Sequence, residues 1–107
     1  MTDIYRAIAD PIRRKILISL SNKELTQSDI VALFAISQPA IKKHLSILLE
    51  ENLIAARREG KYSVYRLKKD VFKLHYQKVQ DELGNILENK LESLKYYLEE
   101  EKSGENH

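Results

Sequence analysis

The stretch SQPAIKKHLSILLEENLI, residues 37–54, combines a strongly apolar repeat with two lysines and a histidine. Its apolar positions recur at i, i+4, i+7 and i+8, and rotation of about 100° per residue places them on one helix face. These positions are Ile41, Leu45, Leu48 and Leu49. Ser37 is a candidate N-cap. The pattern predicts a helix anchored in a core by one face, with Lys43 on the opposite face and Lys42 and His44 on its flanks.

Two helices are predicted before this stretch, and a third leads into it. Residues 3–9 are predicted as a short helix, and Asp10-Pro11 then breaks it and starts the next, because Pro is tolerated in a first turn. That second helix should end near Ser21-Asn22. Thr26 and Asp29 have the spacing of a capping box, which predicts a third helix of about two to three turns. Its apolar face would hold Ile30, Val31, Leu33 and Phe34.

After Asn52 the apolar period changes from helical to alternating, which is typical of β-strands. Residues 54–58 and 62–67 are predicted as two strands joined around Glu59-Gly60-Lys61. Gly60 can adopt the positive φ that a tight hairpin demands. The prediction is a β-hairpin with a cationic tip.

Residues 70–101 hold no Pro, and their single glycine, Gly84, is outweighed by apolar residues at steps of three and four. These residues are Phe72, Tyr76, Val79, Leu83, Leu87, Leu91, Leu94 and Leu98. They predict a helix of roughly 45 Å, at about 1.5 Å per residue, with an apolar seam. A small body cannot cover so long a seam, so we expect the same helix of a second chain to cover it in a homodimer. Residues 102–107 are expected to fray.

The composition is that of a basic body with an acidic tail. At 107 residues the chain is long enough for one compact core, and it contains no cysteine. Residues 1–69 carry thirteen Lys and Arg against seven Asp and Glu, a net charge of +6; residues 70–107 carry five against nine, a net charge of −4. No apolar run reaches about 18 residues, and no signal segment opens the chain. We expect a cytoplasmic protein that binds a polyanion through its basic part.

In this order the elements predict a mainly α fold with a small β-hairpin, the winged helix-turn-helix with a long C-terminal dimerisation helix. The expected parts are a DNA-binding domain in residues 1–69, the dimerisation helix in 70–101 and the tail in 102–107. The helix after Ser37 can enter a DNA major groove about 12 Å wide, and the cationic hairpin can reach phosphates or the minor groove. A two-fold dimer would present two such helices roughly 34 Å apart, which suits an inverted-repeat operator.

Three stretches also carry a family resemblance. They read IYRAIADPIRRKILISL, LTQSDIVALFAISQPAIKKHLSILLEENLI and RREGKYSVYRL, and they span about residues 4–67. In order and spacing they resemble the ArsR/SmtB family of bacterial winged-helix transcription repressors. The resemblance implies a homodimeric transcriptional repressor that binds duplex DNA. It implies a recognition helix with contact residues Ser37, Gln38, Ala40, Lys42, Lys43 and His44, and a wing with Arg57, Arg58, Gly60, Lys61 and Tyr62.

Metal-sensing members of that family use residues that are missing from this sequence. Residues 25–33 hold no cysteine pair, and the predicted last helix holds only His75, with no histidine three or four positions after Asp81 or Glu82. We therefore expect no metal and no cofactor. The sequence also lacks a cysteine nucleophile, a Gly-rich phosphate loop and an H-E-x-x-H pair, so an enzyme is not expected.

Several alternatives stay open at this level. A winged helix can serve as a protein-interaction module without sequence-specific DNA binding. Lys42 could hold phosphate rather than read bases, and His44 could be a packing residue. Arg13 and Arg14 could pair with Asp10 instead of touching phosphates. A pocket for an organic effector could be lined by Tyr76, Tyr96 and Tyr97.

Overall fold

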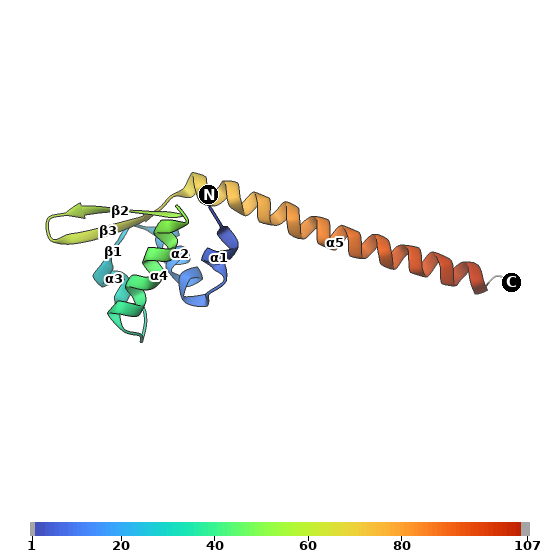
Figure 1. Cartoon of the computed structure of the whole chain (residues 1–107), viewed down its shortest axis with the longest axis horizontal. Helices are drawn as coiled ribbons and strands as arrows, with labels where there is room; N and C mark the ends of the chain where they lie inside the picture. Colours follow the sequence, from blue (N-terminus) through green and yellow to red (C-terminus); the bar gives the residue numbers. More distant parts are fainter. Residues whose placement is uncertain (1, 106–107) are drawn as a thin grey trace. The chain divides into compact units, whose positions relative to one another are not determined.

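The computed structural model describes the backbone of residues 2–105 and the side chains of residues 2–89 and 92–99. The chain divides into two compact units, Met1–His75 and Tyr76–His107. The first holds four helices and a small sheet, and the second is the greater part of one long helix (Figure 1). The predicted fold class, mainly α with a β-hairpin and a long last helix, is confirmed.

The first two helices form where they were predicted, and the structure adds an aspartate cap at the start of each. Helix α1 spans Ile4–Ile8, and Asp3 accepts a hydrogen bond from the Arg6 N–H at 3.0 Å. Helix α2 spans Pro11–Asn22, and Asp10 accepts from the N–H groups of Ile12 and Arg13 at 2.8 and 3.3 Å. Side-chain caps of this kind satisfy the unpaired N–H groups of a first helical turn. The two helices bury Ile4, Ala7, Ile16, Leu17 and Leu20.

The predicted capping box is present, but the helix that it starts is shorter than expected. The Thr26 hydroxyl accepts from the Asp29 N–H at 3.1 Å, and the Asp29 carboxylate accepts from the Thr26 N–H at 3.0 Å. Helix α3 spans only Gln27–Val31, because the N–H groups of Leu33 and Phe34 donate to carbonyls three residues earlier rather than four. Of the predicted apolar face, Ile30 is buried and Val31 and Phe34 are half-buried, but Leu33 is 41% exposed, so its assignment to that face is wrong.

Helix α4 spans Gln38–Glu50, and the Ser37 hydroxyl caps it by accepting from the Ala40 N–H at 3.3 Å. Ile41, Leu45 and Leu48 are buried as predicted, but Leu49 is 38% exposed, so its assignment to the buried face is wrong. Leu53, just after the helix, is buried in the core instead. Asn52 adopts a φ of 61°, which reverses the chain at the helix end and lets the Leu53 N–H donate to the Leu48 carbonyl at 3.2 Å.

The hairpin forms as predicted and gains a third strand. Strand β2 spans Ile54–Glu59 and pairs antiparallel with β3, Tyr62–Leu67, and Gly60 takes a φ of 59° at the tip. Strand β1, Leu25–Thr26, pairs with the other edge of β3, giving the order β1-β3-β2. Sequence patterning missed β1, since two residues are too few to show an alternation.

Helix α5 spans Lys69–Glu105 and so continues past the predicted end near residue 101. Of the predicted seam, Phe72 is half-buried and Val79 is buried. The other described seam residues are about half exposed: Tyr76, Leu83, Leu87, Leu94 and Leu98. The side chain of Leu91, and the predicted fraying at 106–107, lie outside the described residues. Across the described part of the chain, no helix is both long and apolar enough to cross a membrane.

Candidate nucleic-acid interface

The polar side of α4 is held outward by the burial of its other side. Ile41, Leu45 and Leu48 are at most 1% exposed, and burying such a side chain contributes about 1.5–3 kcal/mol. None of the predicted contact residues is fully buried: Ser37, Gln38, Lys42 and Lys43 are exposed, and Ala40 and His44 are half-buried. The anchoring therefore fixes the direction of two cations near the start of α4.

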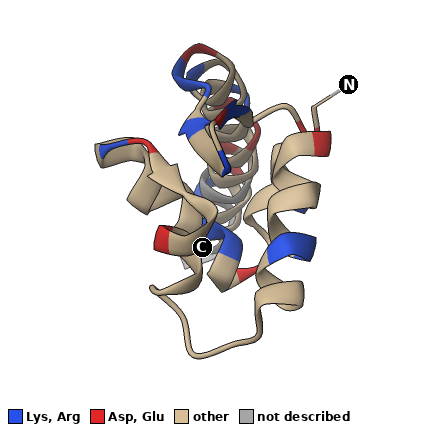
Figure 2. Cartoon of the chain, turned by 90° about the vertical axis from the view of Figure 1, so that its left-hand side faces the viewer, with Lys and Arg blue, Asp and Glu red and all other residues tan. Residues whose placement is uncertain are grey.

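The wing presents a second set of cations. Arg58, Gly60, Lys61 and Tyr62 are exposed around the β2–β3 turn, and the Lys61 Nζ lies 5.5 Å from the centre of the Tyr62 ring. Figure 2 views the protein from the side of the hairpin tip, with Lys and Arg in blue and Asp and Glu in red. Among the described residues, no carboxylate lies within ion-pair distance of Lys42, Lys43, Arg58 or Lys61.

Arg57, the other cation predicted for the wing, is engaged within the protein. Its Nε and Nη2 donate to Glu59 Oε1 at 3.0 and 2.8 Å, and its Nη1 donates to the Glu24 carboxylate. These hydrogen bonds raise the pKa of Arg57 and lower the pKa of Glu24. Two carboxylates thus compensate the charge of Arg57, whereas the charge of its neighbour Arg58 is not compensated by any described carboxylate.

His44 contacts α2 through Arg13. The Arg13 Nη1 lies 3.1 Å from His44 Nδ1, while its Nε and Nη2 donate to the carbonyls of Ala7 and Arg6 at 2.9 and 2.8 Å. A guanidinium can only donate, so this contact requires His44 Nδ1 to accept and leaves Nε2 as the ring nitrogen that donates. Asp10 Oδ1 is 4.0 Å from the same Nδ1, beyond hydrogen-bond reach. His44 therefore has a packing partner and a donor left for other contacts.

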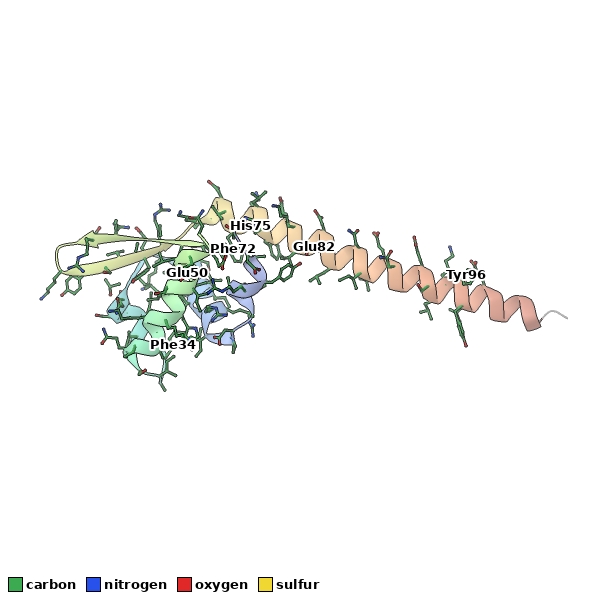
Figure 3. The ribbon with its side chains drawn as sticks, viewed as in Figure 1. Phe34, Glu50, Phe72, His75, Glu82 and Tyr96 are labelled. Carbon is green, nitrogen blue, oxygen red and sulfur yellow. The ribbon has the colours of Figure 1, made fainter. Side chains whose placement is uncertain are left out.

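A carboxylate that sequence reasoning missed ties α1 to the end of α4. Glu51 is 6% exposed, and it accepts from Arg6 Nη1 at 2.6 Å and from the Asp3 N–H at 2.9 Å. The Arg6 hydrogen bond, together with that N–H, lowers the pKa of Glu51. Glu50, labelled in Figure 3, accepts from the same Arg6 Nη1 at 2.9 Å but is exposed. No local pattern in the sequence distinguishes these two adjacent glutamates.

The remaining predicted site residues lie on α5. Tyr76, Tyr96 and Tyr97, considered as effector-pocket residues, are 48%, 69% and 63% exposed, and Figure 3 shows Tyr96 projecting from the helix. The described residues contain no group of three or more His, Cys, Asp or Glu side chains arranged to hold a metal ion.

Known proteins match the same segments. The profile of the family described as "Bacterial regulatory protein, arsR family" matches residues 10–56. The chain is 42% identical over 67 residues to the transcriptional repressor SdpR of Bacillus subtilis (strain 168), covering 63% of this chain and 74% of SdpR. It is 43% identical over 63 residues to a probable mercury resistance operon repressor of Streptomyces lividans, covering 56% of this chain and 50% of that protein.

A solved structure supports the same relationship. The crystal structure of a possible transcriptional regulator for arsenical resistance superposes with a TM-score of 0.68 at 28% identity, over 83% of this chain and 97% of that one. A match over 83% of this chain is longer than residues 1–69, so it also takes in part of the last helix. The chain therefore belongs to the arsR family of bacterial regulatory proteins and is a DNA-binding transcriptional regulator.

Proposed function

We propose that the protein is a homodimeric transcriptional repressor, without enzymatic activity, that binds an inverted-repeat operator in the cytoplasm. The observation that carries this proposal is the polar side of α4, where Lys42 and Lys43 are exposed and free of carboxylate partners among the described residues. Names of relatives support it, since SdpR is a transcriptional repressor.

The proposed mechanism has an electrostatic part and a readout part. Cations on α4 and the wing attract the phosphate backbone, and this attraction weakens as salt is added. The start of α4 then enters the major groove, where Ser37, Gln38 and His44 can meet base edges. Lys42 and Lys43 meet the backbone from α4, and the wing reaches the flanking backbone through Arg58 and Lys61. A repressor bound in this way would block access of RNA polymerase.

The proposed dimer uses α5. The described leucines of its predicted seam are each more than half exposed and repeat at helical spacing: Leu83, Leu87, Leu94 and Leu98. Such a seam is typical of a helix that packs against a second helix. In a two-fold dimer each protomer would supply one α4 to each half of a palindromic site.

A double substitution tests the proposal. Lys42→Ala with Lys43→Ala should lower affinity for duplex DNA by about a hundredfold near physiological salt and reduce the salt slope, because each protomer of a dimer would lose two cations that face the DNA backbone. The measurement is fluorescence anisotropy with a duplex selected by the wild-type protein from random-sequence DNA.

The matched control replaces two lysines elsewhere in the same unit. Lys23 and Lys69 are both exposed, and the pair Lys23→Ala and Lys69→Ala changes the net charge equally. We expect this control to bind within a few-fold of wild type. Equal losses in both variants, with folds intact by circular dichroism, would exclude α4 as the contact surface.

A further inference from the structure

A polar pocket of about 220 Å³ lies where the wing tip approaches the starts of α3 and α4. Helix α3 contributes its first two residues and α4 its first, while the hairpin contributes the rest. The lining residues on which the argument rests are Gln27, Ser28, Gln38, Arg58, Lys61 and Ser63. Each carries a hydrogen-bond donor, and two of them are cations.

The carboxylates nearest in sequence to the pocket are turned to other partners. Glu59 adjoins Arg58, but its Oε1 accepts two hydrogen bonds from Arg57 at 3.0 and 2.8 Å. Asp29 adjoins Ser28, but its side chain accepts from the Thr26 N–H at 3.0 Å. No acidic side chain is part of the lining. The ion pair of Arg57 and the capping box thus leave the pocket with an uncompensated positive charge.

We propose that this pocket holds one phosphodiester group of the DNA backbone, a contact that rests on the DNA binding proposed above. Phosphate oxygens only accept hydrogen bonds, and all six lining residues named above can donate. Arg58 and Ser63 are directly paired across β2 and β3, which places their side chains on the same face of the hairpin. Gln27, Ser28 and Ser63 thereby become backbone-contact residues that the sequence did not indicate.

The position and openness of the pocket favour DNA over a free anion. Gln38 borders the pocket and is also the first residue of α4, so a phosphate held there lies beside the bases that α4 would read. The lining side chains are exposed or half-buried. A site for a small free anion usually encloses most of its ligand, whereas a backbone contact stays open on the side of the duplex.

A charge placed inside the pocket tests this proposal. Ser28→Glu should lower affinity for the duplex selected by the wild-type protein by at least about tenfold, because a carboxylate there repels the phosphate. The fold should be retained, since an acidic side chain in the first turn of a helix is favourable. Ser19→Glu is the matched control: it changes the net charge equally at a half-buried position of α2, outside the pocket. We expect its affinity to remain within about twofold of wild type.

A double-mutant cycle separates a local contact from general repulsion. In the wild-type background, Lys61→Gln should reduce the slope of log K against log salt by about 0.9 for each phosphate that the lysine neutralises. In the Ser28→Glu background the same substitution should leave the slope unchanged, because the phosphate is already excluded. A slope that falls equally in both backgrounds would show that Lys61 does not share a phosphate with Ser28, and would overturn the proposal.

The outcomes distinguish this proposal from the proposed function. If wild-type protein selects no duplex from random-sequence DNA, DNA binding itself fails. If it does select a duplex and Ser28→Glu binds as tightly as Ser19→Glu, only the pocket assignment fails. Titration with inorganic phosphate, followed by NMR shifts of the Ser28 and Lys61 amides, is expected to show weak binding. Submillimolar binding would assign the pocket to a free anion instead.

Discussion

At the scale of residues, two adjacent arginines of the wing have different partners. Arg57 and Arg58 are equivalent in the sequence pattern, yet Arg57 donates to Glu59 and Glu24, whereas Arg58 lines the polar pocket. Alternation along a strand sends neighbouring side chains to opposite faces, so the two arginines meet different surroundings. We therefore propose that Arg58 and Lys61 make the wing's DNA contact, whereas Arg57 links β2 to the residue that precedes β1.

This difference predicts the effects of two charge-neutral double variants. Glu24→Gln with Arg57→Gln should leave the salt slope of DNA binding unchanged, because an internally compensated pair contacts no phosphate. Arg58→Gln with Glu88→Gln, which removes an exposed carboxylate of α5, should reduce the slope by about 0.9 for each phosphate that Arg58 neutralises. Binding isotherms at several salt concentrations measure both. A reduced slope in the Arg57 variant alone would return that residue to the interface.

At the scale of elements, α1 is linked to the end of α4 by Arg6. Its guanidinium donates to buried Glu51 at 2.6 Å and to exposed Glu50 at 2.9 Å. Exposed ion pairs contribute little to stability, whereas a buried acceptor that loses its partner costs about 1–3 kcal/mol. The end of α4 should therefore depend on Glu51 rather than on Glu50.

The two glutamates predict a matched comparison with a definite pH dependence. At pH 7, Glu51→Gln should lower the free energy of unfolding by about 1–2 kcal/mol, while Glu50→Gln should change it by less than about 0.5 kcal/mol. The pKa of Glu51 is lowered from 4.5 in the folded state. The stabilisation that the ionised Glu51 gives the folded state is therefore complete above pH 4.5 and is lost as pH falls through the lowered pKa. Urea unfolding at pH 7 and at several acidic pH values tests both points.

Two outcomes would contradict these expectations for Glu50 and Glu51. If Glu50→Gln destabilises the protein as much as Glu51→Gln, burial does not distinguish the two carboxylates. If the deficit of Glu51→Gln persists in acid, the ion pair with Arg6 is not its source.

At the scale of the whole molecule, α5 carries a row of leucines whose side chains are more than half exposed. Leu87 and Leu94 are 59% and 54% exposed, and the row continues at Leu83 and Leu98. Exposed apolar residues that repeat along one helix face are typical of protein interfaces. A second copy of α5 would cover this row and would double the number of DNA-reading helices.

Disrupting the row should produce monomers. Leu87→Glu with Leu94→Glu is expected to halve the mass measured by light scattering at micromolar concentration and to weaken binding to a palindromic duplex. Asn85→Glu with Asn89→Glu adds the same charge on exposed positions outside the leucine row and should leave the dimer intact. A leucine variant that keeps the wild-type mass would remove α5 from the proposed interface.

Local patterns were sufficient to predict most elements. The caps at Ser37 and Thr26 and the turn at Gly60 all form, because each depends on residues within a few positions along the chain. The predicted ends of the helices, and the residues assigned to their buried faces, were less accurate. Helix α3 ends early and Leu49 is exposed, since the end of a helix depends on where the following chain must turn to reach the core.

The sequence by itself determined the order of helices and hairpin, the cationic character of α4 and the wing, and the family resemblance. Only the tertiary structure decided which charges are compensated. Arg57 meets Glu24 across 33 positions, and Arg6 meets Glu51 across 45. Hydrophobic periodicity reports the nearest neighbours on one element and carries no information about such distant partners. An exposed cation and an internally paired one therefore look identical in the sequence, and the fold separates them.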